Sequence, residues 1–150
     1  MQLPAAIRAM RPHQWAKNVF VLAAFCFALG DKNFDMGVEA AVNVLMACFA
    51  FSFGASAIYL VNDVMDVESD RKHPEKCKRP IAAGEVSVAQ ALALSAVCVV
   101  GALWLAAVST PVEGDNVMAV VGVYMVSNLL YSLKLKQIAI VDAFLIALGF

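Results

Sequence analysis

The stretch that decides the fold runs from Val38 to Gly84. It begins with the apolar run Val38–Val61, VEAAVNVLMACFAFSFGASAIYLV, and continues directly into the charged sequence Asn62–Gly84, NDVMDVESDRKHPEKCKRPIAAG. The apolar run contains no Lys, Arg or Pro. At about 1.5 Å per residue, a helix of this length can cross the ~30 Å hydrocarbon core of a bilayer. The stretch therefore predicts a membrane-spanning helix that ends in a charged loop at the membrane surface.

Four further apolar runs surround this stretch, at about residues 19–30, 88–109, 117–133 and 138–150. The chain is 62% hydrophobic, whereas soluble domains are usually about 45–50% apolar. A backbone that crosses lipid must satisfy its own hydrogen bonds, so helices are the expected form of these runs. The sequence predicts an all-α membrane protein in which residues 1–150 belong to one transmembrane domain.

The run at residues 19–30 is short for a membrane span. It can cross a bilayer if the helix extends back toward Trp15, a residue type that favours the headgroup level. A secretory signal peptide is the alternative, because basic residues precede the apolar run. The long polar lead of residues 1–18 favours the membrane helix.

The basic residues indicate how the helices are oriented. If the five runs alternate across the membrane, the N-terminus and the loops 62–87 and 134–137 share one side. That side then holds ten of the eleven Lys and Arg residues, and the other side holds only Lys32. Because Lys and Arg concentrate in cytoplasmic loops, the N-terminus and the charged loop are expected in the cytoplasm.

An acidic cluster lies where the Val38–Val61 helix leaves the membrane. On a continued helix, Asp63, Asp66 and Asp70 fall within about 60° of one another. Carboxylates this close repel one another unless a cation lies between them. Mg²⁺ accepts one or two carboxylates together with oxygens of a substrate phosphate. The alternative is a solvated acidic helix end stabilised by surface pairs such as Glu68–Lys72, and the spacing leaves both open.

The basic segment 71–79 contains five Lys and Arg residues. They can fix the topology, bind anionic lipid headgroups or bind substrate phosphates, for which Arg offers a two-pronged fork. Farther along, Lys136 can reach the membrane interface or the same phosphates. Neither a zinc site nor a disulfide framework is expected, because the four cysteines form no C-x-x-C pair. No nucleic-acid partner is expected either.

These motifs together resemble the UbiA superfamily of intramembrane prenyltransferases. The sequence N-D-x-x-D-x-x-x-D at 62–70, followed by R-P-I-A-x-G at 79–84, is similar to the first aspartate-rich motif of that family. Three more motifs resemble those of its decaprenyl-phosphate phosphoribosyltransferase branch. These motifs are R-P-H-Q-W-x-K-N at 11–18, A-x-Y-L-x-N-D at 57–63 and Y-S-x-x-L-K at 131–136.

The resemblance implies a bundle of nine helices around a central cavity, of which this chain supplies about five. It implies that Asp63, Asp66 and Asp70 hold Mg²⁺ against a diphosphate. The candidates for substrate binding are Asn62, Lys17, Arg71, Lys76, Arg79, Tyr131 and Lys136. The implied reaction moves phosphoribose from phosphoribosyl diphosphate to a polyprenyl (decaprenyl) phosphate in the bacterial plasma (inner) membrane, for cell-wall arabinan precursors.

Two other functions stay open on the sequence. One is a UbiA-type enzyme that attaches a polyprenyl chain to an aromatic acceptor, and the other is a non-catalytic membrane component. Members of the family are longer than this chain and carry a second aspartate-rich motif, which residues 85–150 lack. The chain is therefore expected to be an N-terminal half, inactive without the missing C-terminal half of the same protein.

Overall fold

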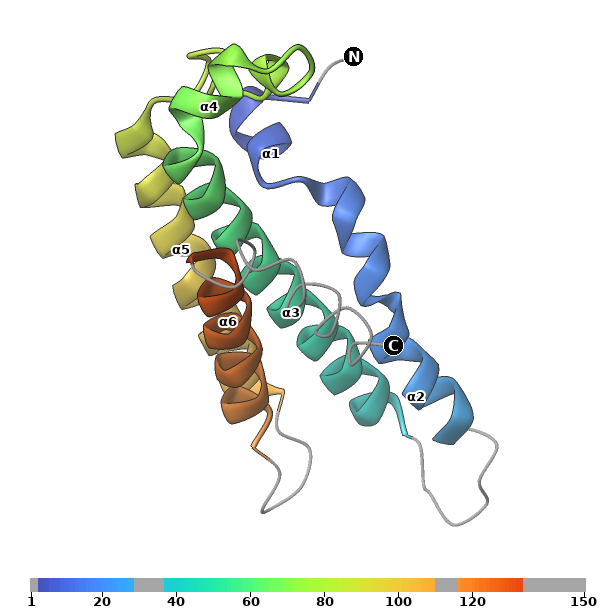
Figure 1. Ribbon diagram of the computed structural model, residues 1–150. Helices are drawn as coiled ribbons and strands as arrows, with labels where there is room; N and C mark the ends of the chain where they lie inside the picture. The colour runs from blue at the N-terminus through green and yellow to red at the C-terminus, as the bar shows by residue number, and fades with distance from the viewer. Residues whose placement is uncertain (1–2, 29–36, 110–115, 134–150) are drawn as a thin grey trace.

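A computed structural model describes residues 3–28, 37–109 and 116–133, and every regular element within them is helical (Figure 1). Three long helices dominate: α3 (Val38–Met65), α5 (Val88–Val108) and α6 (Val117–Leu133). Helices α3 and α5 are long and apolar enough to cross a membrane, and α6 is a shorter apolar helix. The helices predicted at 38–61, 88–109 and 117–133 are thus confirmed, whereas the predicted span at 138–150 lies outside the described residues.

Helix α3 is the central element, because α5, α6 and the N-terminal segment all pack against it. Most of the buried apolar side chains are small, which lets the helix backbones approach closely, as is usual between membrane helices. The two buried clusters consist of Ala9, Ala57, Leu60, Ile81, Val86, Ala91 and Cys98, and of Ala50, Ala102, Ala106 and Val121. The Ser95 hydroxyl on α5 donates to the Ala57 carbonyl of α3 at 3.0 Å.

The N-terminal segment runs alongside α3 (Figure 1). It consists of α1 (Ala5–Ala9), the 3-10 helix η1 (Pro12–Val19) and α2 (Phe20–Ala28). The short run predicted at 19–30 is therefore extended toward the N-terminus, as its length required.

Polar side chains join η1 to α3. The Trp15 indole, which was expected at the headgroup level, is half-buried and donates to the Ser56 hydroxyl at 2.9 Å. The Asn18 amide donates to the Ser52 hydroxyl at 2.9 Å. Because Ser52 and Ser56 lie one helical turn apart, they present a polar stripe of α3 to the N-terminal segment.

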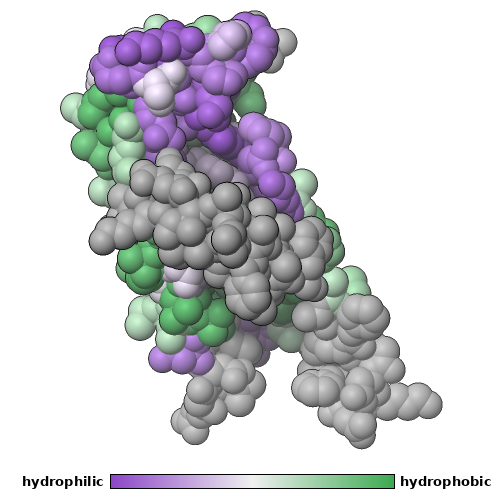
Figure 2. Space-filling model, viewed as in Figure 1, coloured by the Kyte–Doolittle hydropathy of each residue, from purple (hydrophilic) through white to green (hydrophobic). Residues whose placement is uncertain are grey.

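Hydrophilic residues gather at one end of the molecule (Figure 2), over α4 (Val67–Lys72) and the segment that follows it. Helix α3 ends at Met65, and Asp66 separates it from α4, so the single helix expected through residue 70 is broken. The segment continues through the 3-10 helix η2 (Lys76–Lys78) and a turn in which Gly84 has φ of 79°. Glycine adopts this left-handed conformation without strain.

Helix α5 begins with a capping box. The Ser87 hydroxyl accepts from the Gln90 backbone N–H at 3.2 Å, and the Gln90 side chain accepts from the Ser87 N–H at 2.9 Å. This arrangement satisfies two backbone donors that the first turn of the helix leaves unpaired.

Gly54 lies where α3 packs against Met125 of α6. A Cβ atom at this position would lie 3.2 Å from Cγ and 3.3 Å from Sδ of Met125. A larger side chain at Gly54 would therefore require the Met125 side chain, or α6 with it, to shift.

We expect Gly54→Leu to lower the melting temperature of the detergent-solubilised protein, because overpacking a helix contact costs about 1–3 kcal/mol. Gly122→Leu on α6 is the matched control, since a Cβ at Gly122 meets nothing within 4 Å. Differential scanning fluorimetry measures both. Equal melting temperatures for the two variants would contradict the close contact at Gly54.

Candidate functional site

Two buried carboxylates converge on one arginine at the hydrophilic end. Nη1 of Arg79 donates to Oδ1 of Asp63 at 3.1 Å and to Oδ2 of Asp70 at 2.7 Å. Asp63 is 3% exposed and Asp70 is 2% exposed. Buried carboxylates are tolerated when they are paired with a cation and hydrogen-bonded. Arg79 therefore compensates the charge of both aspartates.

Arg11 is a second cation on Asp63. Its Nη2 donates to Oδ1 of Asp63 at 2.5 Å, and its guanidinium carbon lies 5.0 Å from the ring centroid of Tyr59. Arg11 adopts φ of 54°, a left-handed conformation that is uncommon for non-glycine residues. In the sequence, Arg11 belongs to the N-terminal motif without a predicted site role, because only the packing of η1 on α3 brings it to Asp63.

The ion pairs tie separate elements together. Asp63 belongs to α3, Asp70 to α4 and Arg79 to the turn that follows η2, while Arg11 immediately precedes η1. Nearby, Arg8 of α1 forms an ion pair with Glu85, just before α5. These residues of the N-terminal segment and of the 62–87 loop therefore lie at the same end of the bundle.

Asp66 occupies the break between α3 and α4. Its carbonyl accepts from the Ser69 hydroxyl and from the Asp70 N–H, each at 2.8 Å. An unbroken helix would place Asp63 and Asp70 about 10 Å apart along its axis. The predicted continuous helix therefore does not account for the contact of both carboxylates with one guanidinium. Within the described residues, no three His, Cys, Asp or Glu side chains group closely enough to hold a metal ion by themselves. Asp63 and Asp70 are the carboxylates that lie together.

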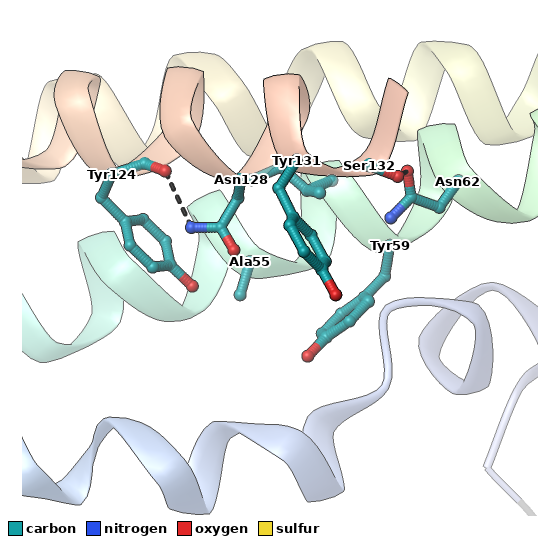
Figure 3. A pocket seen from close by; sticks show the side chains of 8 residues that line it. Ala55, Tyr59, Asn62, Tyr124, Asn128, Tyr131 and Ser132 are labelled. Atoms are coloured by element: carbon teal, nitrogen blue, oxygen red, sulfur yellow. Dashed lines mark hydrogen bonds between the residues drawn. The ribbon is translucent and has the colours of Figure 1, made fainter. Parts of the chain in front are cut away.

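A cavity of about 300 Å³ adjoins this cluster between α3 and α6 (Figure 3). Asn62, the residue before Asp63, is part of its lining, and its side-chain carbonyl accepts from the Ser132 hydroxyl. The Asn128 amide donates to the Tyr124 carbonyl at 2.8 Å. The described residues that line it are Ala55, Ile58, Tyr59, Asn62, Tyr124, Asn128, Tyr131 and Ser132.

The other predicted substrate contacts lie apart from this core. Lys17 on η1 and Lys76 on η2 are exposed. Arg71 is also exposed, and it donates to Glu68 at 3.3 Å and to the Ala82 carbonyl at 3.4 Å. Glu68 thus pairs with Arg71 rather than with Lys72, the surface partner expected from helical spacing. Lys136 lies outside the described residues.

The arrangement combines two kinds of chemistry. Asp63 and Asp70 present oxygen ligands of the type that hard divalent cations prefer. Arg11 and Arg79 present guanidinium groups, whose geometry suits phosphate. The neighbouring cavity adds neutral hydrogen-bonding groups. A small phosphorylated ligand could therefore contact all three sets of residues.

Known proteins with similar sequences cover nearly the whole chain. The profile of the UbiA prenyltransferase family matches residues 13–150. A decaprenyl-phosphate phosphoribosyltransferase from Corynebacterium glutamicum is 42% identical over 144 residues, which are 96% of this chain and 42% of that protein. The proteins of the same name from Mycobacterium tuberculosis and Mycolicibacterium smegmatis are 46% and 40% identical, over 91% and 96% of this chain.

The chain spans less than half the length of these relatives, at 44% of each of the two mycobacterial proteins. The family match nevertheless includes the aspartate motif, Arg79 and helices α3, α5 and α6, and Arg11 lies two residues before it begins. With the helical architecture described above, this extent of similarity confirms the predicted all-α membrane fold, and the chain belongs to the UbiA prenyltransferase family.

Proposed function

We propose that the protein containing this chain transfers phosphoribose from phosphoribosyl diphosphate to a polyprenyl phosphate such as decaprenyl phosphate. The observation that carries the proposal is the buried Asp63–Arg79–Asp70 cluster beside a neutral polar cavity. The names of the 40–46% identical relatives favour this substrate pair over others within the family. The reaction would supply precursors for cell-wall arabinan.

Mg²⁺ is the proposed cofactor, and the cluster fits it. One oxygen each of Asp63 and Asp70 already shares a single cationic partner, Nη1 of Arg79. Mg²⁺ needs only one or two carboxylates when waters and a substrate diphosphate supply the other oxygens. Asp63 and Asp70 would hold the ion, with Asp66 as the third predicted ligand. When bound, it would neutralise charge on the leaving diphosphate.

The arginines have a second role in this proposal. Guanidinium groups that release carboxylate oxygens to a metal can turn their donors toward phosphate. Arg79 and Arg11 are the nearest candidates, and the exposed Arg71, Lys76 and Lys17 can approach from the surface. Lys136 is proposed for the same task. Such positive charge stabilises a departing diphosphate without a nucleophilic side chain.

The proposed location is the bacterial plasma membrane, with the hydrophilic end in the cytoplasm. The arginines at 8, 11, 71 and 79 all lie at this end of the bundle, as the rule for cytoplasmic Lys and Arg requires. A water-soluble substrate such as phosphoribosyl diphosphate can reach a site that opens toward the cytoplasm.

A second candidate activity is the transfer of a polyprenyl chain to an aromatic acceptor, which the family name favours. Purified complete protein should be offered phosphoribosyl diphosphate with polyprenyl phosphate, or a polyprenyl diphosphate with an aromatic acceptor. Turnover of the first pair alone supports the proposal. Turnover of the second pair alone supports prenyl transfer, and turnover of neither indicates a non-catalytic membrane component.

We expect Asp63→Asn or Asp70→Asn to reduce phosphoribosyl transfer by at least about 100-fold, since each removes a charged ligand from the metal–diphosphate site. The assay measures labelled phosphoribose on polyprenyl phosphate with Mg²⁺ present. Glu75→Gln is the control, because Glu75 is an exposed carboxylate paired with Lys78. Full activity in both Asp variants would rule out their metal role.

We expect Arg79→Met to lower the melting temperature sharply, because removing one partner of a buried ion pair costs about 3–5 kcal/mol. Adding Asp70→Asn to this variant should restore part of the loss. Millimolar Mg²⁺ should also raise the melting temperature of Arg79→Met, by compensating the same carboxylates. Lys78→Met, which breaks an exposed pair, is the control. If the melting temperature of Arg79→Met is the same with and without Mg²⁺, that result would count against metal binding at Asp63 and Asp70.

We also propose that the site is completed by a C-terminal half that corresponds to the rest of the longer relatives. The 150-residue chain expressed alone should therefore give no phosphoribosyl transfer. Co-expression with that C-terminal part should restore activity. Measurable turnover by the isolated chain would refute this expectation.

A further inference from the structure

All three tyrosines of the chain line the cavity between α3 and α6. Tyr59 comes from α3, whereas Tyr124 and Tyr131 come from α6. In Figure 3 the three rings project to the same side of these two helices. Each phenol can both donate and accept a hydrogen bond. The cavity therefore presents several neutral hydrogen-bonding groups to one space.

The rest of the polar lining is also uncharged. Asn62 and Ser132 are bonded to one another, and Asn128 is bonded to the Tyr124 carbonyl. These bonds hold the two amide groups in fixed orientations. No Lys, Arg, Asp or Glu is among the described residues that line the cavity. Such a surface suits a polyhydroxylated ligand better than an anion.

The cavity lies next to the charged cluster of Asp63, Asp70, Arg79 and Arg11. Asn62 lines the cavity and precedes Asp63, and Tyr59 lies one helical turn before Asp63. The Tyr59 ring also contacts the Arg11 guanidinium, which donates to Asp63. A ligand could therefore place a charged end beside Arg11 and Arg79 and a neutral, hydroxylated part among the tyrosines.

A second cavity, among α3, α5 and α6, has a different character. There, Val61 of α3 and Met125 and Leu129 of α6 contribute to an apolar cavity of about 200 Å³. Helix α6 thus turns polar side chains toward one cavity and apolar side chains toward the other. An isoprenyl chain carries no hydrogen-bonding group, so in the tyrosine-lined cavity it would desolvate polar groups without compensation.

We infer that the tyrosine-lined cavity binds the ribose of phosphoribosyl diphosphate, and that Tyr59 and Tyr131 select a sugar over an isoprenyl group. The inference rests on the proposed function and adds the residues that recognise the sugar. A volume of about 300 Å³ falls at the lower end of the range for small-ligand sites, which is about 300–1,000 Å³. Sites that hydrogen-bond substrate hydroxyls discriminate strongly against analogues that lack them.

The test uses the complete protein with Tyr59→Phe and Tyr131→Phe, which keep the rings and remove the hydroxyls. Isothermal titration calorimetry measures the affinity for phosphoribosyl diphosphate and for inorganic diphosphate, each with Mg²⁺. We expect each variant to bind phosphoribosyl diphosphate about 10-fold more weakly, the effect of one lost hydrogen bond of about 1.4 kcal/mol. Affinity for inorganic diphosphate should not change. Ser127→Ala, which removes an exposed hydroxyl from α6, is the matched control for both ligands.

The outcomes separate the inference from the proposed function. Unchanged affinity of both Phe variants for phosphoribosyl diphosphate would overturn the inference alone. Equal weakening of both ligands would also overturn it, because the hydroxyls would then support the diphosphate site or the fold. Wild-type protein that binds geranyl diphosphate and inorganic diphosphate but not phosphoribosyl diphosphate would overturn the proposed function, and with it the inference.

Discussion

The burial of two carboxylates at the polar end of a membrane bundle is the constraint on which the rest of the structure depends. Asp63 and Asp70 are almost completely inaccessible, and such groups need a cation within hydrogen-bonding distance. Arg79 meets this need for both, and Arg11 adds a second contact to Asp63. The break at Asp66 belongs to the chain path that carries these groups to one place, and the left-handed Gly84 follows directly after it. The local structure of this end therefore follows from charge compensation.

The remainder of the fold supplies a rigid frame for that cluster. Helix α3 contacts each of the other long elements, through small residues toward α5 and α6 and through hydroxyl groups toward η1. A serine in an apolar helix satisfies its own hydroxyl locally, and Ser52 and Ser56 also accept from Asn18 and Trp15. Polar contacts inside a membrane are geometrically selective, because a misplaced partner would leave a polar group unpaired in lipid. They therefore align the N-terminal segment along α3.

Local features of the sequence predicted the elements, and long-range packing decided the site. The apolar runs predicted the three long helices. The spacing of the aspartates indicated that a cation should offset their charge, and Arg79 contacts both Asp63 and Asp70 in the structure, whereas the metal stays a prediction. The sequence could not show that Arg11 also contacts Asp63, because 52 residues separate the two. The ending of α3 at Met65 was also missed, since nothing in the residue types around Asp66 forbids a continuing helix. The tyrosine-lined cavity is formed by two helices whose relative rotation depends on contacts such as Gly54 with Met125.

The shared oxygen of Asp63 has a consequence for how the chain assembles during synthesis. Arg11 leaves the ribosome before Asp63, and Arg79 follows Asp63 by 16 residues. When the end of α3 has just left the ribosome, Arg11 is thus the one of its two arginine partners that has already emerged. The carboxylate at this helix end can then be neutralised by the preceding N-terminal segment before the turn that carries Arg79 emerges. The early arginine would then act as a temporary counter-ion during insertion, and the later one would complete the finished cluster.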